Sequence, residues 1–157
     1  MSNDFIIIPF EKKLINFFID LNMDWLNEFF EVEPYDLKIL NQSESLIINK
    51  GGYIFFGKQN DQIISTFALI KRGKRSFELA KMAVDTKKRN NGCGNKMIQF
   101  IISFGKKNNW KEIFLYSNTK LKNSIHLYNK YGFRKIDIEK KSPYLRGNIK
   151  MKVLLET

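Results

Sequence analysis

Cysteine and histidine are nearly absent from this sequence, because Cys93 and His126 are the only ones among its 157 residues. One cysteine excludes an internal disulfide and agrees with a reducing compartment, so we expect a cytoplasmic protein. Many metal sites are recognised in a sequence by clusters of cysteine and histidine. Since the chain has no such cluster, no metal centre is expected.

Long apolar runs are also missing, as are internal repeats and low-complexity tracts. No apolar stretch reaches the roughly 20 residues that cross a bilayer, so no membrane partner is expected. The apolar segment 5–9 is too short for a signal peptide and follows no positive residue, so we interpret it as a strand. With 43% hydrophobic residues the chain can form a core, and we predict a single domain over residues 1–157.

Charge is divided unequally along the chain, whose formal net charge is +11. Residues 1–70 contain 5 Lys or Arg against 10 Asp or Glu, and residues 71–157 contain 22 against 6. A uniformly basic chain would indicate a nucleic-acid partner. An acidic first part and a basic second part instead favour two ligands of opposite sign, and nucleic acid is not expected. The alternative is that both parts are solvated surfaces.

The hydrophobic pattern predicts alternating strands and helices. Helical spacing marks residues 11–20 and 22–30, with Asn22 as the N-cap of the second helix. The other predicted elements are strands at 5–9, 53–57, 63–70, 76–84, 110–116, 133–138 and 148–155, helices at 96–104 and 121–131, and one or two helical turns at 35–40. Short polar turns predict an antiparallel meander over 53–84, and the helix before 110–116 predicts that this strand is parallel to 76–84. We therefore expect an α/β protein with a mixed sheet.

A strand, a glycine-containing turn and a helix follow one another between residues 79 and 104. The first N–H groups of a helix have no partner within it, and with the positive helix end they suit a phosphate. Gly92 and Gly94 allow a ligand close to the backbone, and the basic run 87–89 adds charge. The spacing is not that of a dinucleotide fingerprint, because Met97 stands at the third glycine position, and no Gly-Lys-Ser/Thr is present.

The run Arg89-Asn90-Asn91-Gly92-Cys93-Gly94 resembles the pyrophosphate-binding motif Arg/Gln-x-x-Gly-x-Gly/Ala of the GNAT family, the Gcn5-related N-acetyltransferases. A second run, from Ser124 through Tyr128 to Gly132-Phe133, is similar to the family's Ala-x-x-x-Tyr-x-x-x-Gly-Phe motif, with serine where alanine is usual. The resemblance implies the GNAT fold: a central mixed sheet of six or seven strands flanked by about four helices. Two parallel strands would be splayed apart at the cofactor site.

The resemblance also implies an activity. A GNAT enzyme moves an acetyl group from acetyl-coenzyme A, its co-substrate, to a primary amine of a small molecule or peptide, by direct attack in a ternary complex. The alternative is a non-catalytic module of the same fold that senses acyl-coenzyme A or binds nucleic acid. A homodimer is compatible with both.

The family motifs carry residue roles over to this chain. Residues predicted to bind the cofactor are Met82, Ala83 and Val84 for the pantetheine arm, Arg89, Asn90, Asn91, Gly92, Cys93, Gly94 and Asn95 for the pyrophosphate, and also Asn118 and Lys130. Tyr128 matches the tyrosine that protonates the departing thiolate, and Glu78 stands where several members keep a general base. The alternatives are core packing for Tyr128 and, for Glu78, a surface position with water relaying the proton.

Acceptor binding is predicted for the acidic first part of the chain. Asp24, Glu28, Glu31 and Glu33 are the carboxylates expected to face a cationic acceptor. The alternatives are that they face water, or that the acceptor itself carries a carboxylate held by an arginine or lysine.

Two further side chains have reactive groups. Cys93 stands at a helix N-terminus among cations, which would favour its thiolate, but it occupies a variable position of the motif. A covalent acetyl-cysteine mechanism is therefore not expected. His126 has no Ser and Asp partners at a recognisable spacing and is expected at the surface.

Overall fold

A seven-stranded sheet forms the centre of the structure, a computed structural model that describes residues 4–89 and 92–155. Its strands are β1 (Phe5–Pro9), β2 (Tyr53–Gln59), β3 (Gln62–Lys71), β4 (Ser76–Val84), β5 (Glu112–Ser117), β6 (Arg134–Ile136) and β7 (Ile149–Leu154). They lie in the order β1-β2-β3-β4-β5-β7-β6. β4 and β5 are parallel, whereas the other neighbours are antiparallel. The predicted mixed sheet, its meander and its parallel pair are confirmed.

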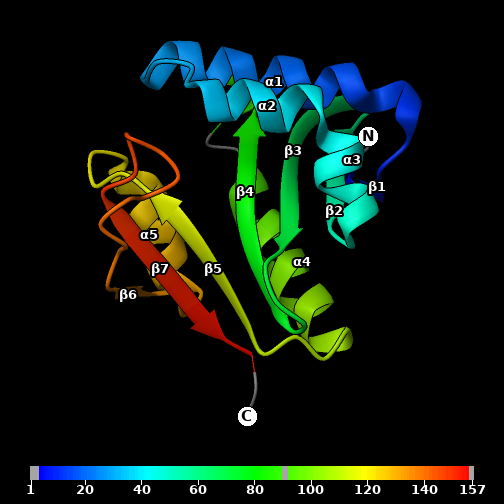
Figure 1. Ribbon diagram of the computed structural model, residues 1–157. Helices are drawn as coiled ribbons and strands as arrows, with labels where there is room; N and C mark the ends of the chain where they lie inside the picture. Colours follow the sequence, from blue (N-terminus) through cyan, green and yellow to red (C-terminus); the bar gives the residue numbers. More distant parts are fainter. Residues whose placement is uncertain (1–3, 90–91, 156–157) are drawn as a thin grey trace.

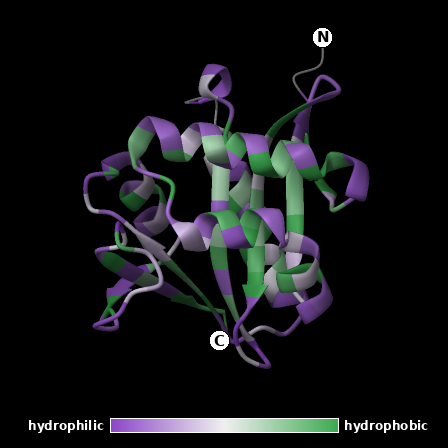
Figure 2. Ribbon diagram, turned by 45° about the horizontal axis from the view of Figure 1, so that its top comes forward, coloured by the Kyte–Doolittle hydropathy of each residue, from purple (hydrophilic) through white to green (hydrophobic). Residues whose placement is uncertain are grey.

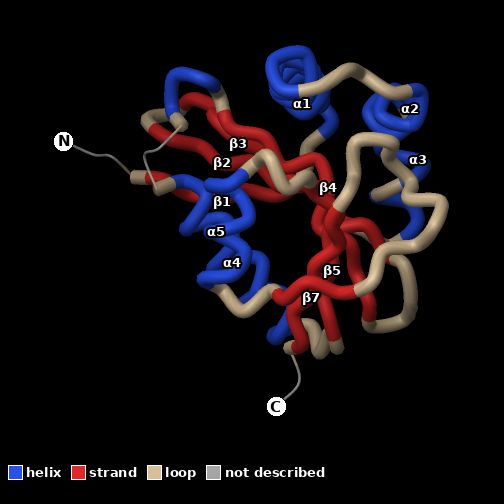
Figure 3. Tube along the Cα trace, turned by 90° about the vertical axis from the view of Figure 1, so that its left-hand side faces the viewer, coloured by secondary structure: helices blue, strands red, loops and turns tan. Residues whose placement is uncertain are grey.

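Helices cover both faces of the sheet (Figure 3). They are α1 (Ile15–Phe29), α2 (Pro34–Asn41), α3 (Ser43–Leu46), α4 (Cys93–Lys107) and α5 (Lys122–Lys130), with 3-10 turns at Lys12–Leu14, Ile48–Lys50 and Thr86–Lys88. One core lies between the sheet and α4 with α5, and a second lies between the sheet and α1 with α2. We call these two sides of the sheet the α4/α5 face and the α1/α2 face.

The middle strands are buried on both sides, because each face of the sheet is covered by helices. In β3, Phe67 and Leu69 join the core on the α4/α5 face, whereas Ala68 and Ile70 join the other core. Side chains of a strand alternate between faces, so a strand covered on both sides reads as a continuous apolar run. Figure 2 shows the middle strands mostly green, while the helices carry both colours.

The first helix corrects one prediction from the sequence. The two helical patterns belong to a single helix, α1, and Asn22 lies buried in its middle rather than at an N-cap. Its side-chain amide donates to the carbonyl oxygens of Phe18, at 3.0 Å, and of Lys81 on β4, at 3.1 Å. A polar residue is tolerated here because its donors are used.

The parallel strands β4 and β5 form a fork. They pair over Ser76–Glu78 and Glu112–Phe114 and then diverge (Figure 1). Along the diverging part, the register of β4 against β3 shifts, and Lys81 adopts φ of 55°. Such a bulge bends a strand and turns it away from its neighbour. The predicted splayed pair is thereby confirmed, and it opens the sheet where a ligand could enter.

Candidate active site

A cleft of about 670 Å³ passes through the sheet at the fork. Its middle is lined by residues 78–84 of β4 and 115–118 at the end of β5. Helix α1 lines it from the α1/α2 face, and the start of α4 together with α5 lines it from the α4/α5 face. A ligand can therefore reach the fork from either side, and the two sides can bind different molecules.

The α4/α5 side of the cleft fits an anion. Helix α4 begins after Gly92, which has φ of 81°, and no side chain of the described residues caps its first turn. Its first N–H groups are therefore open to a ligand. Lys88 and Lys130 line the cleft near this helix start, and the Lys130 ammonium donates to Asn95 Oδ1 at 2.9 Å. This donor set fits the pyrophosphate of coenzyme A.

Several residues predicted for the cofactor lie on this side. Met82, Ala83 and Val84 line the cleft beyond the point where β4 leaves β5, as do Gly92, Cys93, Gly94 and Asn95. Asn90 and Asn91 lie outside the described residues. Arg89 lines the cleft, but it also donates to Val84 O at 3.2 Å and pairs with Glu28 at 2.7 Å.

Asn118 lines the cleft and also makes hydrogen bonds within the protein. Its amide nitrogen donates to the Arg146 carbonyl at 2.7 Å, and its oxygen accepts from the Lys120 N–H at 2.9 Å. The first of these bonds holds the loop between β6 and β7 against the end of β5. A contact with the cofactor stays a prediction for this residue.

Tyr128 lines the cleft from α5, on the same side as the anion site. Its ring packs against Phe133, with 5.8 Å between ring centroids. Burial raises the pKa of Tyr128 to about 12, so the hydroxyl keeps its proton at neutral pH. No hydrogen-bond partner for this hydroxyl is found in residues 4–89 or 92–155. The group is therefore available to a ligand.

Glu78 lines the cleft on the opposite face from Tyr128. Its neighbours Phe77 and Leu79 point into the core on the α4/α5 face, so its own side chain points to the α1/α2 face. It is 2% exposed, and Arg72 Nη2 lies 2.8 Å from its Oε1. Burial raises the pKa of the Glu78 carboxyl, although the charge of Arg72 opposes the shift. The alternative of a surface position is wrong.

The predicted acidic cluster does not form. Asp24 and Glu31 are exposed, Glu28 pairs with Arg89, and none of the four carboxylates lines the cleft. Glu33 accepts hydrogen bonds from the backbone N–H groups of Leu145, at 2.8 Å, and Arg146, at 3.2 Å. It holds the loop between β6 and β7, and it faces that loop rather than an acceptor.

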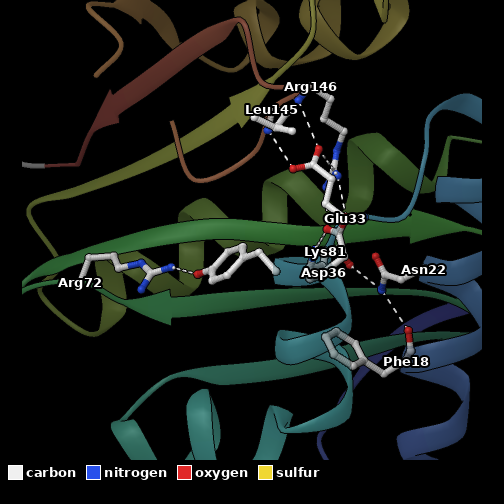
Figure 4. A network of polar contacts seen from close by, with 9 residues as sticks. Phe18, Asn22, Glu33, Asp36, Arg72, Lys81, Leu145 and Arg146 are labelled. Atoms are coloured by element: carbon white, nitrogen blue, oxygen red, sulfur yellow. Dashed lines mark hydrogen bonds and ion pairs between the residues drawn. The ribbon is translucent and has the colours of Figure 1, made fainter. Parts of the chain in front are cut away.

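A buried ionic network, which the sequence did not reveal, lies beneath the cleft on the α1/α2 face (Figure 4). Asp36 of α2 is fully buried and binds the Arg146 guanidinium through two hydrogen bonds of 2.7 and 2.8 Å. It also pairs with the ammonium of Lys81, the bulge residue of β4. Burial alone would raise the pKa of Asp36, but hydrogen bonds from Arg146 and the charge of Lys81 outweigh it and lower the pKa to about 2. The network joins α2, β4 and the β6–β7 loop.

Cys93 and His126 are both part of the cleft wall. Burial raises the pKa of the Cys93 thiol, although the charges of Lys96 and Lys88 oppose it, so the expectation that this position favours a thiolate is wrong. His126 is exposed, as expected. Within the described ranges, no three His, Cys, Asp or Glu side chains group so as to hold a metal. Nor is any helix there long and apolar enough to cross a membrane.

Comparison with known proteins gives one match to a protein family and several matches to solved structures. The sequence matches the acetyltransferase (GNAT) family over residues 15–133, whereas no curated protein sequence matches it significantly. A solved acetyltransferase of the GNAT family from Staphylococcus aureus Mu50 has a TM-score of 0.85 at 24% identity, covering 98% of this chain and 100% of that one. An acetyltransferase from Streptococcus agalactiae 2603 has a TM-score of 0.81 at 20% identity, covering 99% and 100%. Spermidine N-acetyltransferase from Vibrio cholerae, in complex with CoA and spermine, has a TM-score of 0.76 at 18% identity, covering 98% and 97%.

Proposed function

This chain belongs to the GNAT family of acetyltransferases, and from that premise we propose that it transfers the acetyl group of acetyl-coenzyme A directly to a primary amine. One observation supports the proposal above the others. Glu78 and Tyr128 line the same cleft from opposite faces of the sheet, at the fork between β4 and β5. Direct transfer needs a base on the acceptor side and an acid on the donor side.

Each step of the proposed transfer would use residues of the cleft. Bound acetyl-coenzyme A would supply the activated acetyl group as a thioester. The N–H groups at the start of α4, with Lys88 and Lys130, would hold its pyrophosphate, and the backbone of residues 82–84, which does not pair with β5, would bind its pantetheine arm. Glu78 would take a proton from the incoming ammonium. As the C–N bond forms and the C–S bond breaks, Tyr128 would give its proton to the thiolate and regain one from solvent.

Acetyl-coenzyme A should raise the melting temperature by roughly 5–10 °C at about 100 times its Kd, because it binds only the folded state. Gly94→Glu should abolish the shift. A side chain added at Gly94 meets Leu127 at 2.9 Å, and a carboxylate there would repel the pyrophosphate. The matched control is Gly73→Glu in the exposed β3–β4 turn, which should keep the shift. A normal shift in the Gly94 variant would show that the pyrophosphate binds elsewhere.

Glu78→Gln should depress the rate mainly below the pKa of the acceptor amine, where the amine arrives protonated. The raised pKa of Glu78 places the acid limb of the wild-type profile above the usual range of a glutamate, since only the carboxylate accepts a proton. The measurement is kcat/KM as a function of pH. The control is Glu112→Gln, because Glu112 lies away from the cleft. An unchanged profile would indicate a water relay instead of Glu78.

Turnover decides between the proposed transfer and a non-catalytic sensor. With a panel of amines, the enzyme should release free coenzyme A thiol in equal amount to acetylated amine, whereas a sensor would bind acetyl-coenzyme A without releasing thiol. The single domain, the cytoplasmic location and the homodimer stay predictions.

A further inference from the structure

Aromatic rings make up much of the cleft wall on the α1/α2 face. Trp25, Phe29 and Phe30 come from the end of α1, Tyr116 from β5 and Tyr144 from the β6–β7 loop. The rings contact one another: the Trp25 centroid lies 5.5 Å from that of Phe29 and 5.6 Å from that of Phe30. This wall can bury a flat or aliphatic group away from water.

Carboxylates are scarce on the same wall. Among the described residues that line the cleft, Glu78 is the one carboxylate, and Arg72 already pairs with it. Lys81 and Arg146 line this side but are already paired with Asp36, and Arg146 also pairs with Glu33, whereas the Lys120 ammonium donates to the Phe29 carbonyl oxygen. An acceptor with a second ammonium group would therefore meet the positive charge of Lys120 and no further carboxylate among the described residues of the wall, and like charges held close together repel.

The faces of several rings are also taken by cations of the chain itself. Lys120 Nζ lies 4.2 Å from the centroid of Phe30, and the Arg146 guanidinium carbon lies 4.6 Å from that of Tyr144. A ring face attracts a cation through its negative charge density. Because these faces are occupied, the wall offers an acceptor apolar contact more than cation binding.

We propose that the acceptor is a monoamine with an apolar or aromatic body, and not a polyamine; this rests on the proposed transfer to an amine. The amino group lies at Glu78, and the body packs against Trp25 and its neighbouring rings. This proposal replaces the prediction that carboxylates in the acidic first part of the chain bind a cationic acceptor. It also separates this chain from its structural neighbour that is a spermidine N-acetyltransferase.

Two amines that differ by one terminal amino group test the proposal on the unmodified protein. The kcat/KM for pentylamine should exceed that for cadaverine by about tenfold or more, and phenethylamine should be better than pentylamine. Equal or higher kcat/KM for cadaverine or spermidine would overturn the monoamine acceptor while leaving amine acetylation intact. No turnover with any of these amines would overturn both.

Trp25→Ala tests the apolar wall itself. It should raise the KM for phenethylamine about tenfold and leave the Kd for acetyl-coenzyme A unchanged, because the residue lines only the acceptor side. Phe17→Ala, on the exposed surface of the same helix, is the matched control and should change neither. An unchanged KM in the Trp25 variant would overturn the assignment of the body to these rings.

Discussion

Tyr128→Phe should lower kcat for acetyl transfer by about 100-fold or more and leave the Kd for acetyl-coenzyme A within about twofold. Only the transition state needs the phenolic proton, whereas the ring that packs against Phe133 stays in place. With a pKa of about 12, the phenol is a weak acid toward a thiolate in water. In the proposed transfer, the same burial would also destabilise the departing thiolate and so favour its protonation.

Steady-state kinetics measures kcat, and isothermal titration calorimetry measures the Kd for acetyl-coenzyme A. Tyr53→Phe is the matched control, since it removes a hydroxyl from a ring that packs in the core and does not line the cleft. It should leave kcat unchanged. If Tyr128→Phe turned over at the wild-type rate, Tyr128 would have a packing role only.

Asp36→Asn should destabilise the fold by about 3–5 kcal/mol, because it leaves Lys81 buried without its carboxylate and leaves Arg146 with Glu33 alone. For a chain of this size the melting temperature should fall by roughly 6–20 °C. Asp24→Asn makes the same chemical change on the exposed surface of α1 and should change stability by less than about 0.5 kcal/mol. Equal losses of unfolding free energy in the two variants would show that the network does not stabilise the fold.

The contribution of Asp36 to the stability of the fold depends on pH. Because the pKa of Asp36 is lowered from 3.8 to about 2, its contribution is fully present above the pKa of the unfolded chain and is lost as the pH falls through that interval. The loss of stability in Asp36→Asn should therefore shrink as the pH falls through that interval, and it should shrink again on the alkaline side, where Lys81 loses its proton. Burial lowers the pKa of Lys81, and without the opposing charge of Asp36 the side chain can become neutral. Urea unfolding across pH measures both trends.

Local patterns explain what could be predicted from the sequence. The turn before α4, the strand alternation and the helix closed by Gly132 are each encoded within a few neighbouring residues. The parallel pair follows from the helix between two strands. These features place Tyr128 and Glu78 on the correct elements, and the structure adds that they face one cleft.

Contacts between distant residues explain what could not be predicted. Asp36 and Arg146 are 110 positions apart, and nothing around either residue marks the other as its partner. Lysine rarely adopts positive φ, so the sequence around Lys81 does not predict the bulge there. Glu28 and Glu33 read as free surface carboxylates because Arg89 and Arg146, which neutralise them, lie far along the chain.

Intact-mass measurement of the protein, after mixing with acetyl-coenzyme A alone and then with an amine, tests direct transfer within one cleft. Cys93 is a neutral, buried thiol, so we expect no change in protein mass without the amine and no release of free thiol. Addition of the amine should release one coenzyme A thiol for each acetylated amine, with intersecting lines in double-reciprocal plots. Thiol release without an amine, together with an acetyl group attached to the protein at Cys93, would contradict direct transfer and establish a covalent route.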